Sequence, residues 1–342
     1  MRRAALAAVM YLTAGLACAA PADDWSVCKD ENAAADAAIE ACTRIIKAGK
    51  TKGADLAITY YNRAISYRQK DDTDSALADY NESLRINPKY PKAFNNRGNI
   101  WKDKGDLERA IADYNEAIKL DPKFALAFAN RGDVWDDKGD SNRAVADLDQ
   151  AIRLDPKYSR AYNVRGVVWK KKGDLDRAIA DFTEALRLDP KYVTALANRG
   201  FTWLQKGDFD RAIIDYGQAI TLSPNVASSY ANRATAWLRK GETAKAIADA
   251  DKAISLDAKN PLGYEARARA RLRMGETSGA LADADETITL RPRASAHQVR
   301  GDVYKALARK DEAIADYRKA LELAPDRATR EAAEAALKDL GG

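Results

Sequence analysis

The sequence predicts an all-α solenoid built from antiparallel helical hairpins, and three observations lead to this fold class. Proline recurs at intervals of 34 residues, at Pro88, Pro122, Pro156, Pro190 and Pro224. Within each interval, small and apolar residues follow helical spacing on two separate segments. A Gly-Asp pair separates the two segments in four consecutive intervals. A fixed period of this length indicates stacked supersecondary units, each of which buries its apolar face only against its neighbours.

Residues 1–22 are expected to form a cleaved secretory signal. A short basic region opens the chain, and the apolar run 4–17 is too short for a spanning helix. An Ala-x-Ala pattern follows, so we expect cleavage after Ala19 or Ala22 and a periplasmic or secreted protein, most simply in a Gram-negative periplasm. Two alternatives stay open: an uncleaved interfacial helix, and a lipoprotein acylated at Cys18.

Residues 23–56 resemble a degenerate helical hairpin, which we expect to cap the N-terminal end of the array. The chain has three cysteines, and loss of Cys18 with the signal leaves an even number in an oxidising compartment. We expect Cys28 and Cys42 to form a disulfide that closes a loop of about 15 residues, worth roughly 3 kcal/mol in the chain-entropy model. The alternative is that both cysteines are buried as small apolar side chains.

Residues 57–327 divide into eight repeats, in which the recurring proline is counted as position 32. The repeats begin near Ala57, Pro91, Ala125, Ser159, Val193, Ala227, Pro261 and Ser295. Gly105 suits the left-handed conformation that ends the first helix of a repeat, and Asp106 can cap the second helix. The Asp-Pro pair at 121–122 then stops the second helix. The alanine-rich segment 328–342 is expected to be a C-terminal capping helix.

These positions together resemble the tetratricopeptide repeat, whose pattern is aromatic-x₂-Leu-Gly-x₂-Tyr, then Ala-x₃-Phe, then Pro. The second repeat carries the pattern as Phe94, Gly98, Trp101, Ala110, Tyr114, Ala117 and Pro122. The resemblance covers residues 57–327. It implies a right-handed superhelix in which the first helix of each repeat lines a concave groove, and in which protein or peptide partners bind.

Position 6 is asparagine in five repeats, which identifies a candidate peptide-binding ladder. Its members are Asn62, Asn96, Asn130, Asn198 and Asn232. In the family, an asparagine at this position hydrogen-bonds the backbone of an extended peptide. Its amide can both donate and accept, so it can bind a main chain of any sequence. The alternative is a solvated polar face that repeat duplication has copied.

Position 7, leucine in the family, is arginine in all eight repeats, and position 23 is aspartate in all eight. Folding about the two turns sets each aspartate between the arginine of its own repeat and that of the next repeat. We therefore interpret the two series as a structural ion-pair ladder that fixes register, with little net stabilisation. The alternative is an anion-binding stripe.

A series of tryptophans and a cluster of arginines each have two possible interpretations. Trp101, Trp135, Trp169, Trp203 and Trp237 occupy position 11, where the family packs tyrosine in the interhelix core; the alternative is sugar stacking. Arg267, Arg269, Arg271 and Arg273 alternate along one first helix and form a candidate patch for an acidic partner. A solvated charged helix is the alternative for this patch.

Composition narrows the function. A single histidine excludes histidine-cluster metal sites, and residues 23–56 and 328–342 cannot supply a catalytic domain, so we expect no enzyme, cofactor or metal. A net charge of +5 is too balanced for nucleic-acid binding, and a mean hydropathy of −0.50 excludes a polytopic membrane protein. The expected function is a non-catalytic protein-interaction scaffold, in the cell envelope or secreted, that binds an extended peptide or partner protein in the groove. The alternatives are a carbohydrate-binding envelope module and an acylated outer-membrane lipoprotein acting in envelope assembly.

Overall fold

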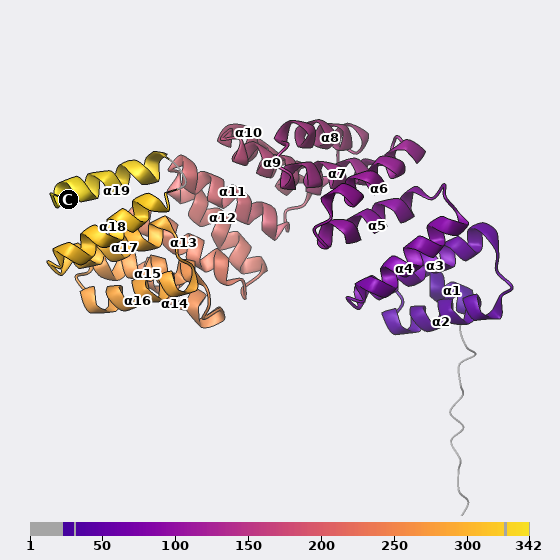
Figure 1. Ribbon diagram of the computed structural model, residues 1–342, viewed down its shortest axis with the longest axis horizontal. Coiled ribbons are helices and arrows are strands. Elements are labelled where there is room, and N and C mark those ends of the chain that lie inside the picture. The colour runs from indigo at the N-terminus through magenta and orange to yellow at the C-terminus, as the bar shows by residue number, and fades with distance from the viewer. Residues whose placement is uncertain (1–22, 31, 325–326, 342) are drawn as a thin grey trace, which may run out of the picture. The chain divides into compact units, whose positions relative to one another are not determined.

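The computed structural model describes residues 23–30, 32–324 and 327–341, so the expected signal at 1–22 lies outside the described residues. The described part is all-α and has nineteen helices, which run as successive helical hairpins followed by the single helix α19, as the repeat pattern predicts (Figure 1). The chain divides into two compact units, the first ending at Lys138 and the second beginning at Gly139. Among the described residues, no helix is both long and apolar enough to cross a membrane.

The helices have nearly constant lengths within the repeats. The first unit contains α1 (Asp24–Lys29), α2 (Ala35–Ala48), α3 (Gly53–Gln69), α4 (Thr73–Ile86), α5 (Pro91–Asp103), α6 (Leu107–Leu120) and α7 (Ala125–Asp137). The second unit contains α8 (Ser141–Leu154), α9 (Ser159–Lys171), α10 (Leu175–Leu188), α11 (Val193–Lys206), α12 (Phe209–Leu222), α13 (Ala227–Lys240), α14 (Thr243–Leu256), α15 (Pro261–Arg273), α16 (Thr277–Leu290), α17 (Ala294–Ala306), α18 (Lys310–Glu322) and α19 (Arg327–Asp339). The odd-numbered helices from α3 to α17 are the first helices of the eight repeats.

Local turn chemistry sets the helix ends. Gly105 follows α5 with φ +78°, and the side chain of Asp106 accepts a hydrogen bond from the backbone N–H of Arg109 at 2.9 Å, which caps α6. The carboxylate of Asp121 follows α6 and accepts from the backbone N–H of Lys123 at 3.0 Å, which forms the turn to the next repeat. Both predicted signals are therefore confirmed.

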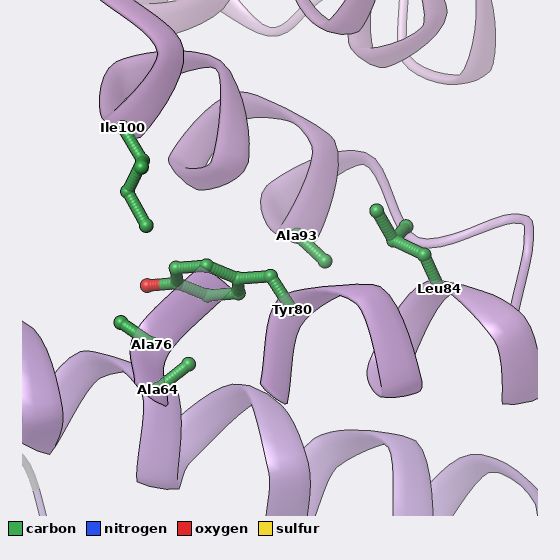
Figure 2. Close-up of a cluster of buried hydrophobic side chains, with 6 residues drawn as sticks. All are labelled: Ala64, Ala76, Tyr80, Leu84, Ala93 and Ile100. Carbon is green, nitrogen blue, oxygen red and sulfur yellow. The ribbon is translucent and has the colours of Figure 1, made fainter. Parts of the chain in front are cut away.

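The core consists of a bulky side chain at position 24 that lies between small residues of neighbouring helices. In the first repeat, Tyr80 of α4 packs against Ala64 of α3 and against Ala93 and Ile100 of α5 (Figure 2). All three neighbours lie in the same buried cluster as Tyr80. The small residue at position 8 makes this approach possible: a Cβ added at Gly166 would lie 2.7 Å from the Phe182 ring.

The first helices form a layer of their own. In the second unit, α9 contacts α11, α11 contacts α13, α13 contacts α15, and α15 contacts α17. In the first unit α5 contacts α7 in the same way. We call the first helices of each unit its inner layer. It agrees with the placement of first helices that the family resemblance implies.

Each end of the described array is closed by a short element. Cys28 of α1 and Cys42 of α2 form the predicted disulfide, with Cα atoms 5.0 Å apart, and both side chains are buried. Helix α3 begins at Gly53, a few residues before the expected start of the first repeat at Ala57. In the second unit, Leu337 of α19 packs on Ala313 and Tyr317 of α18.

Candidate peptide-binding face

The asparagines of position 6 lie on first helices, and three of them join successive repeats. The side-chain amide of each donates to the position-5 residue of the preceding repeat. The pairs are Asn96 to the Tyr61 hydroxyl at 3.1 Å, Asn130 to Asn95 at 2.9 Å and Asn198 to Asn163 at 3.1 Å. These hydrogen bonds tie neighbouring first helices together. They also use an N–H that a bound peptide would need.

Asn62 and Asn232 differ from the other three. Both are half-buried, and neither amide has a side-chain hydrogen-bond partner among the described residues. Each therefore offers a donor and an acceptor on its first helix. Asn62 also lines a small pocket beside Cys28, Ile65 and Gln69. The structure thus divides the predicted ladder into structural and available members, a division that the sequence pattern does not reveal.

The ion-pair ladder is present within each unit. In seven repeats the Nε and Nη2 atoms of the arginine donate to the two carboxylate oxygens of the aspartate, at 2.7–2.9 Å. The pairs are Arg63–Asp79, Arg97–Asp113, Arg165–Asp181, Arg199–Asp215, Arg233–Asp249, Arg267–Asp283 and Arg300–Asp316. The aspartates are buried. Burial raises the pKa of Asp79 and Asp181, while the paired arginines act in the opposite direction. A bidentate pair at each buried carboxylate favours the structural interpretation over an anion-binding stripe.

The prediction that each aspartate also contacts the arginine of the next repeat is wrong. The remaining nitrogen, Nη1, instead reaches position 25 of the preceding repeat. The contacts are Arg97–Asn81 at 2.8 Å, Arg131–Asn115 at 2.6 Å, Arg165–Asp149 at 2.6 Å, Arg199–Thr183 at 3.2 Å, Arg267–Asp251 at 2.7 Å and Arg300–Asp285 at 2.8 Å. Positions 23 and 25 point about 200° apart on a helix, so only position 25 faces the following repeat.

The tryptophans of position 11 are half-buried and pack beside the core, as predicted from the family pattern. Trp101, Trp203 and Trp237 adjoin buried clusters. A basic side chain from position 19 lies over the ring in repeats 2, 4, 5 and 6; Arg109, for example, lies 3.7 Å from the Trp101 ring centre. Sugar stacking would need exposed tryptophan rings, so these contacts do not favour a carbohydrate-binding function.

The arginines of the candidate acidic-partner patch have partners inside the protein. The pairs are Arg267 with Asp283, Arg269 with Glu265, Arg271 with Asp283, and Arg273 with the carbonyl oxygen of Leu238. Arg271 replaces the position-11 tryptophan and donates to Asp283 at 2.7 Å, as Trp237 donates to Asp249 at 3.1 Å. Arg269 is more exposed than Arg267 and Arg271, with 37% of its side-chain surface accessible. Binding of an acidic partner here stays a prediction.

Sequence reasoning missed a second ladder on the surface. A lysine at position 14 contacts position 18 of the preceding repeat, as in Lys104–Asp74 at 2.9 Å and Lys172–Asn142 at 2.8 Å. Lys206 and Lys240 pair with Asp176 and Asp210 in the same way, and the hydrogen bond raises the pKa of Lys240. The signal was the same 34-residue period. Such exposed pairs contribute little stability.

The one histidine belongs to the array rather than to a metal site. His297 is buried at position 4, and its Nδ1 lies 2.9 Å from Asp316, which also pairs with Arg300. Within the described ranges, no group of three or more His, Cys, Asp or Glu side chains could hold a metal ion.

Family models described as the tetratricopeptide repeat match most of the array. One model matches residues 57–90 and 91–124. A second matches three overlapping ranges, 130–193, 170–227 and 203–261, and a third matches 294–327. Together these matches cover more than half of the chain. A search of curated proteins found no match.

Solved structures with similar folds have low sequence identity and so support the fold alone. A tetratricopeptide repeat protein from Parabacteroides merdae is 21% identical, with a TM-score of 0.60 over 74% of this chain and 99% of that one. The PilF protein of Pseudomonas aeruginosa is 20% identical, with a TM-score of 0.54 over 59% of this chain and 92% of that one. A chain of the Cut9–Hcn1 hetero-tetramer is 16% identical, with a TM-score of 0.63 over 93% and 62%. From the matched repeats and the shared fold, the chain belongs to the tetratricopeptide repeat family.

Proposed function

We propose that this protein is a non-catalytic scaffold that binds an extended segment of a partner protein along the inner layer of first helices. Membership of a family of repeat scaffolds supports this function. The observation that carries it is the pair Asn62 and Asn232, whose side-chain amides are unused on half-buried first-helix surfaces. An amide in this state can take both a carbonyl and an N–H from a passing main chain.

We further propose that the scaffold works in the cell envelope or is secreted. The signal-like pattern of residues 1–22 supports export. The Cys28–Cys42 disulfide is compatible with an oxidising compartment. Intact-mass analysis of the expressed protein tests this part: we expect an N-terminus at Ala20 or Asp23 and no free thiol. A mass that fits an acylated Cys18 would favour the lipoprotein alternative, and an unprocessed cytosolic chain would contradict export.

Site-specific crosslinking tests the inner layer. The photoreactive residue p-benzoylphenylalanine replaces Asn62 or Asn232, and, as controls, exposed Ala78 of α4 or Lys252 of α14. We expect a partner protein to crosslink at the two first-helix positions and not at the two control positions. The captured segment, made as a peptide, should bind at least tenfold more weakly to the doubly substituted Asn62→Ala, Asn232→Ala protein. Unchanged affinity, or capture only at the control positions, would contradict the proposal.

A further inference from the structure

Among the residues that the structure describes, Arg233 is the one arginine of the position-7 series whose Nη1 forms no hydrogen bond. Its Nε and Nη2 atoms hold Asp249 at 2.7 and 2.8 Å, as in the other repeats. Position 25 of the preceding repeat is Gly217, which supplies no side-chain oxygen. A Cβ at Gly217 would lie 3.7 Å from Nη1, so the position that normally holds an acceptor is open.

Two further substitutions meet Gly217 on helix α12. Position 22 is alanine in the other seven repeats and is Ile214 here, with 58% of its surface exposed. Positions 26 and 29 form a polar or charged pair in each of the four preceding repeats, such as Glu184 with Arg187 at 2.6 Å. Here they are Gln218 and Thr221, so this pair is absent. Compared with the second helices of the preceding repeats, α12 therefore lacks the position-25 acceptor and the pair at positions 26 and 29. It carries an exposed aliphatic side chain, Ile214, on the same stretch of surface.

These residues line one open pocket of about 660 Å³, which we call the Arg233 pocket. Its lining consists of Pro190, Ile214, Gly217, Gln218, Thr221, Leu222 and Arg233. The Thr221 hydroxyl donates to the Gly217 carbonyl at 2.9 Å, whereas the exposed Gln218 amide has no partner among the described residues. Ile214 and the 40%-exposed Leu222 supply apolar surface. The pocket therefore combines a guanidinium N–H, a free amide and an aliphatic wall. Most of its lining comes from the second helix α12, and Arg233 comes from the adjacent first helix α13.

We propose that the Arg233 pocket binds an acidic side chain of a partner protein, with an adjacent aliphatic residue of that partner on Ile214 and Leu222. The protein's other repeats show that a carboxylate fits this place. Asp149, Asp251 and Asp285 lie 2.6, 2.7 and 2.8 Å from the equivalent Nη1 atoms, although each of those arginines also holds its buried aspartate. A partner carboxylate would supply the acceptor that Gly217 lacks, in a charge-assisted hydrogen bond. This site goes beyond the proposed inner-layer function and does not depend on it.

A matched pair of substitutions at one position tests the site. Gly217→Asn restores the acceptor found in repeats 1 and 2 and so occupies Nη1 from within. Gly217→Ala adds only a Cβ at ordinary contact distance and leaves Nη1 open. Both replace a helical glycine, so folding should be retained, which thermal melting checks. The probe is a fluorescein-labelled peptide, capped at both ends, with glutamate between two leucines; its partner probe has glutamine instead.

We expect the glutamate peptide to bind the wild-type protein and Gly217→Ala within threefold of each other. The glutamate peptide should bind Gly217→Asn at least tenfold more weakly than it binds the wild-type protein. The glutamine peptide should bind the wild-type protein at least tenfold more weakly than the glutamate peptide does. Ile214→Ser should also weaken binding of the glutamate peptide. Equal binding to Gly217→Asn and Gly217→Ala would overturn the proposal. So would binding only by an uncapped peptide through its C-terminal carboxylate, or no binding of the glutamate peptide at millimolar concentration. The Asn62→Ala, Asn232→Ala protein should bind this peptide normally, so failure of the inner-layer function is distinguished from failure of this site.

Discussion

The residue at position 9 supplies the hydrogen-bond partner of the buried position-24 tyrosine in two repeats and does not in the fifth. The Tyr114 hydroxyl donates to Asn99 at 2.8 Å, and the Tyr317 hydroxyl donates to Asp302 at 2.8 Å. In the fifth repeat position 9 is Phe201, and the buried Tyr216 hydroxyl has no partner among the described residues. Burial also raises the pKa of Tyr216. An unpaired buried hydroxyl costs free energy, so a single position makes the same tyrosine favourable in one repeat and unfavourable in another.

Tyr216→Phe should therefore leave the free energy of unfolding unchanged or raise it by up to about 1 kcal/mol, because it removes a hydroxyl that forms no hydrogen bond. Tyr317→Phe is the matched control. It should lower the free energy of unfolding by about 1–3 kcal/mol, because it leaves the Asp302 carboxylate without its donor. Urea denaturation of both variants gives the comparison. Equal losses would mean that the Tyr216 hydroxyl is satisfied by a group other than a described residue.

At the scale of the helix pair, positions 8 and 24 behave as one unit. Gly98, Gly166 and Gly301 face a tyrosine or phenylalanine ring so closely that an added Cβ would lie 2.7–2.8 Å from it. Where position 24 is Ala250 or Ala284, position 8 is alanine as well, and these residues are fully buried. In these repeats a smaller side chain on one helix accompanies a larger one on the other, as close packing requires; the first repeat, with Ala64 against Tyr80, is an exception.

Gly166→Ala should lower the free energy of unfolding by about 1–3 kcal/mol, because the new methyl group overlaps the Phe182 ring. Phe182→Ala should cost about 3–5 kcal/mol through the cavity it leaves. The double variant recreates the alanine pair of the sixth repeat, so its cost should be smaller than the sum by roughly 1 kcal/mol or more. A double-mutant cycle by chemical denaturation measures this coupling, and strict additivity would contradict it.

The stability of the N-terminal hairpin depends more on the Cys28–Cys42 disulfide than the stability of the repeats does. Helix α1 has only six residues and is joined to α2 through Cys28 and Cys42. The Cys28→Ser, Cys42→Ser protein should lose about 3 kcal/mol of local stability in residues 24–48. Hydrogen exchange by mass spectrometry should show faster exchange there and unchanged exchange in α12–α18, because repeat arrays transmit stability mainly between neighbours. A uniform increase along the chain would contradict this.

At the scale of the whole molecule, the sixth and seventh repeats have the least bulky cores. Ala250 and Ala284 replace the aromatic residue of position 24, and Arg271 replaces tryptophan at position 11. Less apolar area is therefore buried per repeat. We expect amide exchange in residues 240–290 to be at least tenfold faster than in residues 160–222 of the same unit. Peptide-resolved exchange in low and high salt measures both stretches. Equal protection would show that the alanine pairs and the Arg271–Asp283 contact replace the aromatic packing fully.

The backbone of this fold could be predicted from sequence because its signals are local. Gly105 and Asp106 fix one turn, and Asp121 begins the next, wherever the repeat lies. The disulfide followed from the even number of cysteines left after the signal, and the arginine–aspartate pairs seen in seven repeats followed from their spacing. The contacts between repeats could not be predicted in the same way. These contacts depend on how neighbouring helices rotate against one another, which the period and the composition do not encode. The rotation determines which oxygen accepts a hydrogen bond from Nη1 of the arginine. It also determines whether the Asn96 amide faces a groove or the Tyr61 hydroxyl.

The arginine of position 7 has a consequence for how such a protein can evolve. Every repeat carries this arginine, so position 25 alone determines whether the outer surface has an open guanidinium N–H. One codon change, such as Asp149→Gly, would leave a second Nη1 without its acceptor, and the reverse change at Gly217 would occupy Nη1 of Arg233. Neither change disturbs the buried ion pair that holds the arginine. A gene built by duplication can therefore gain or lose partners one repeat at a time, while the fold beneath is inherited intact.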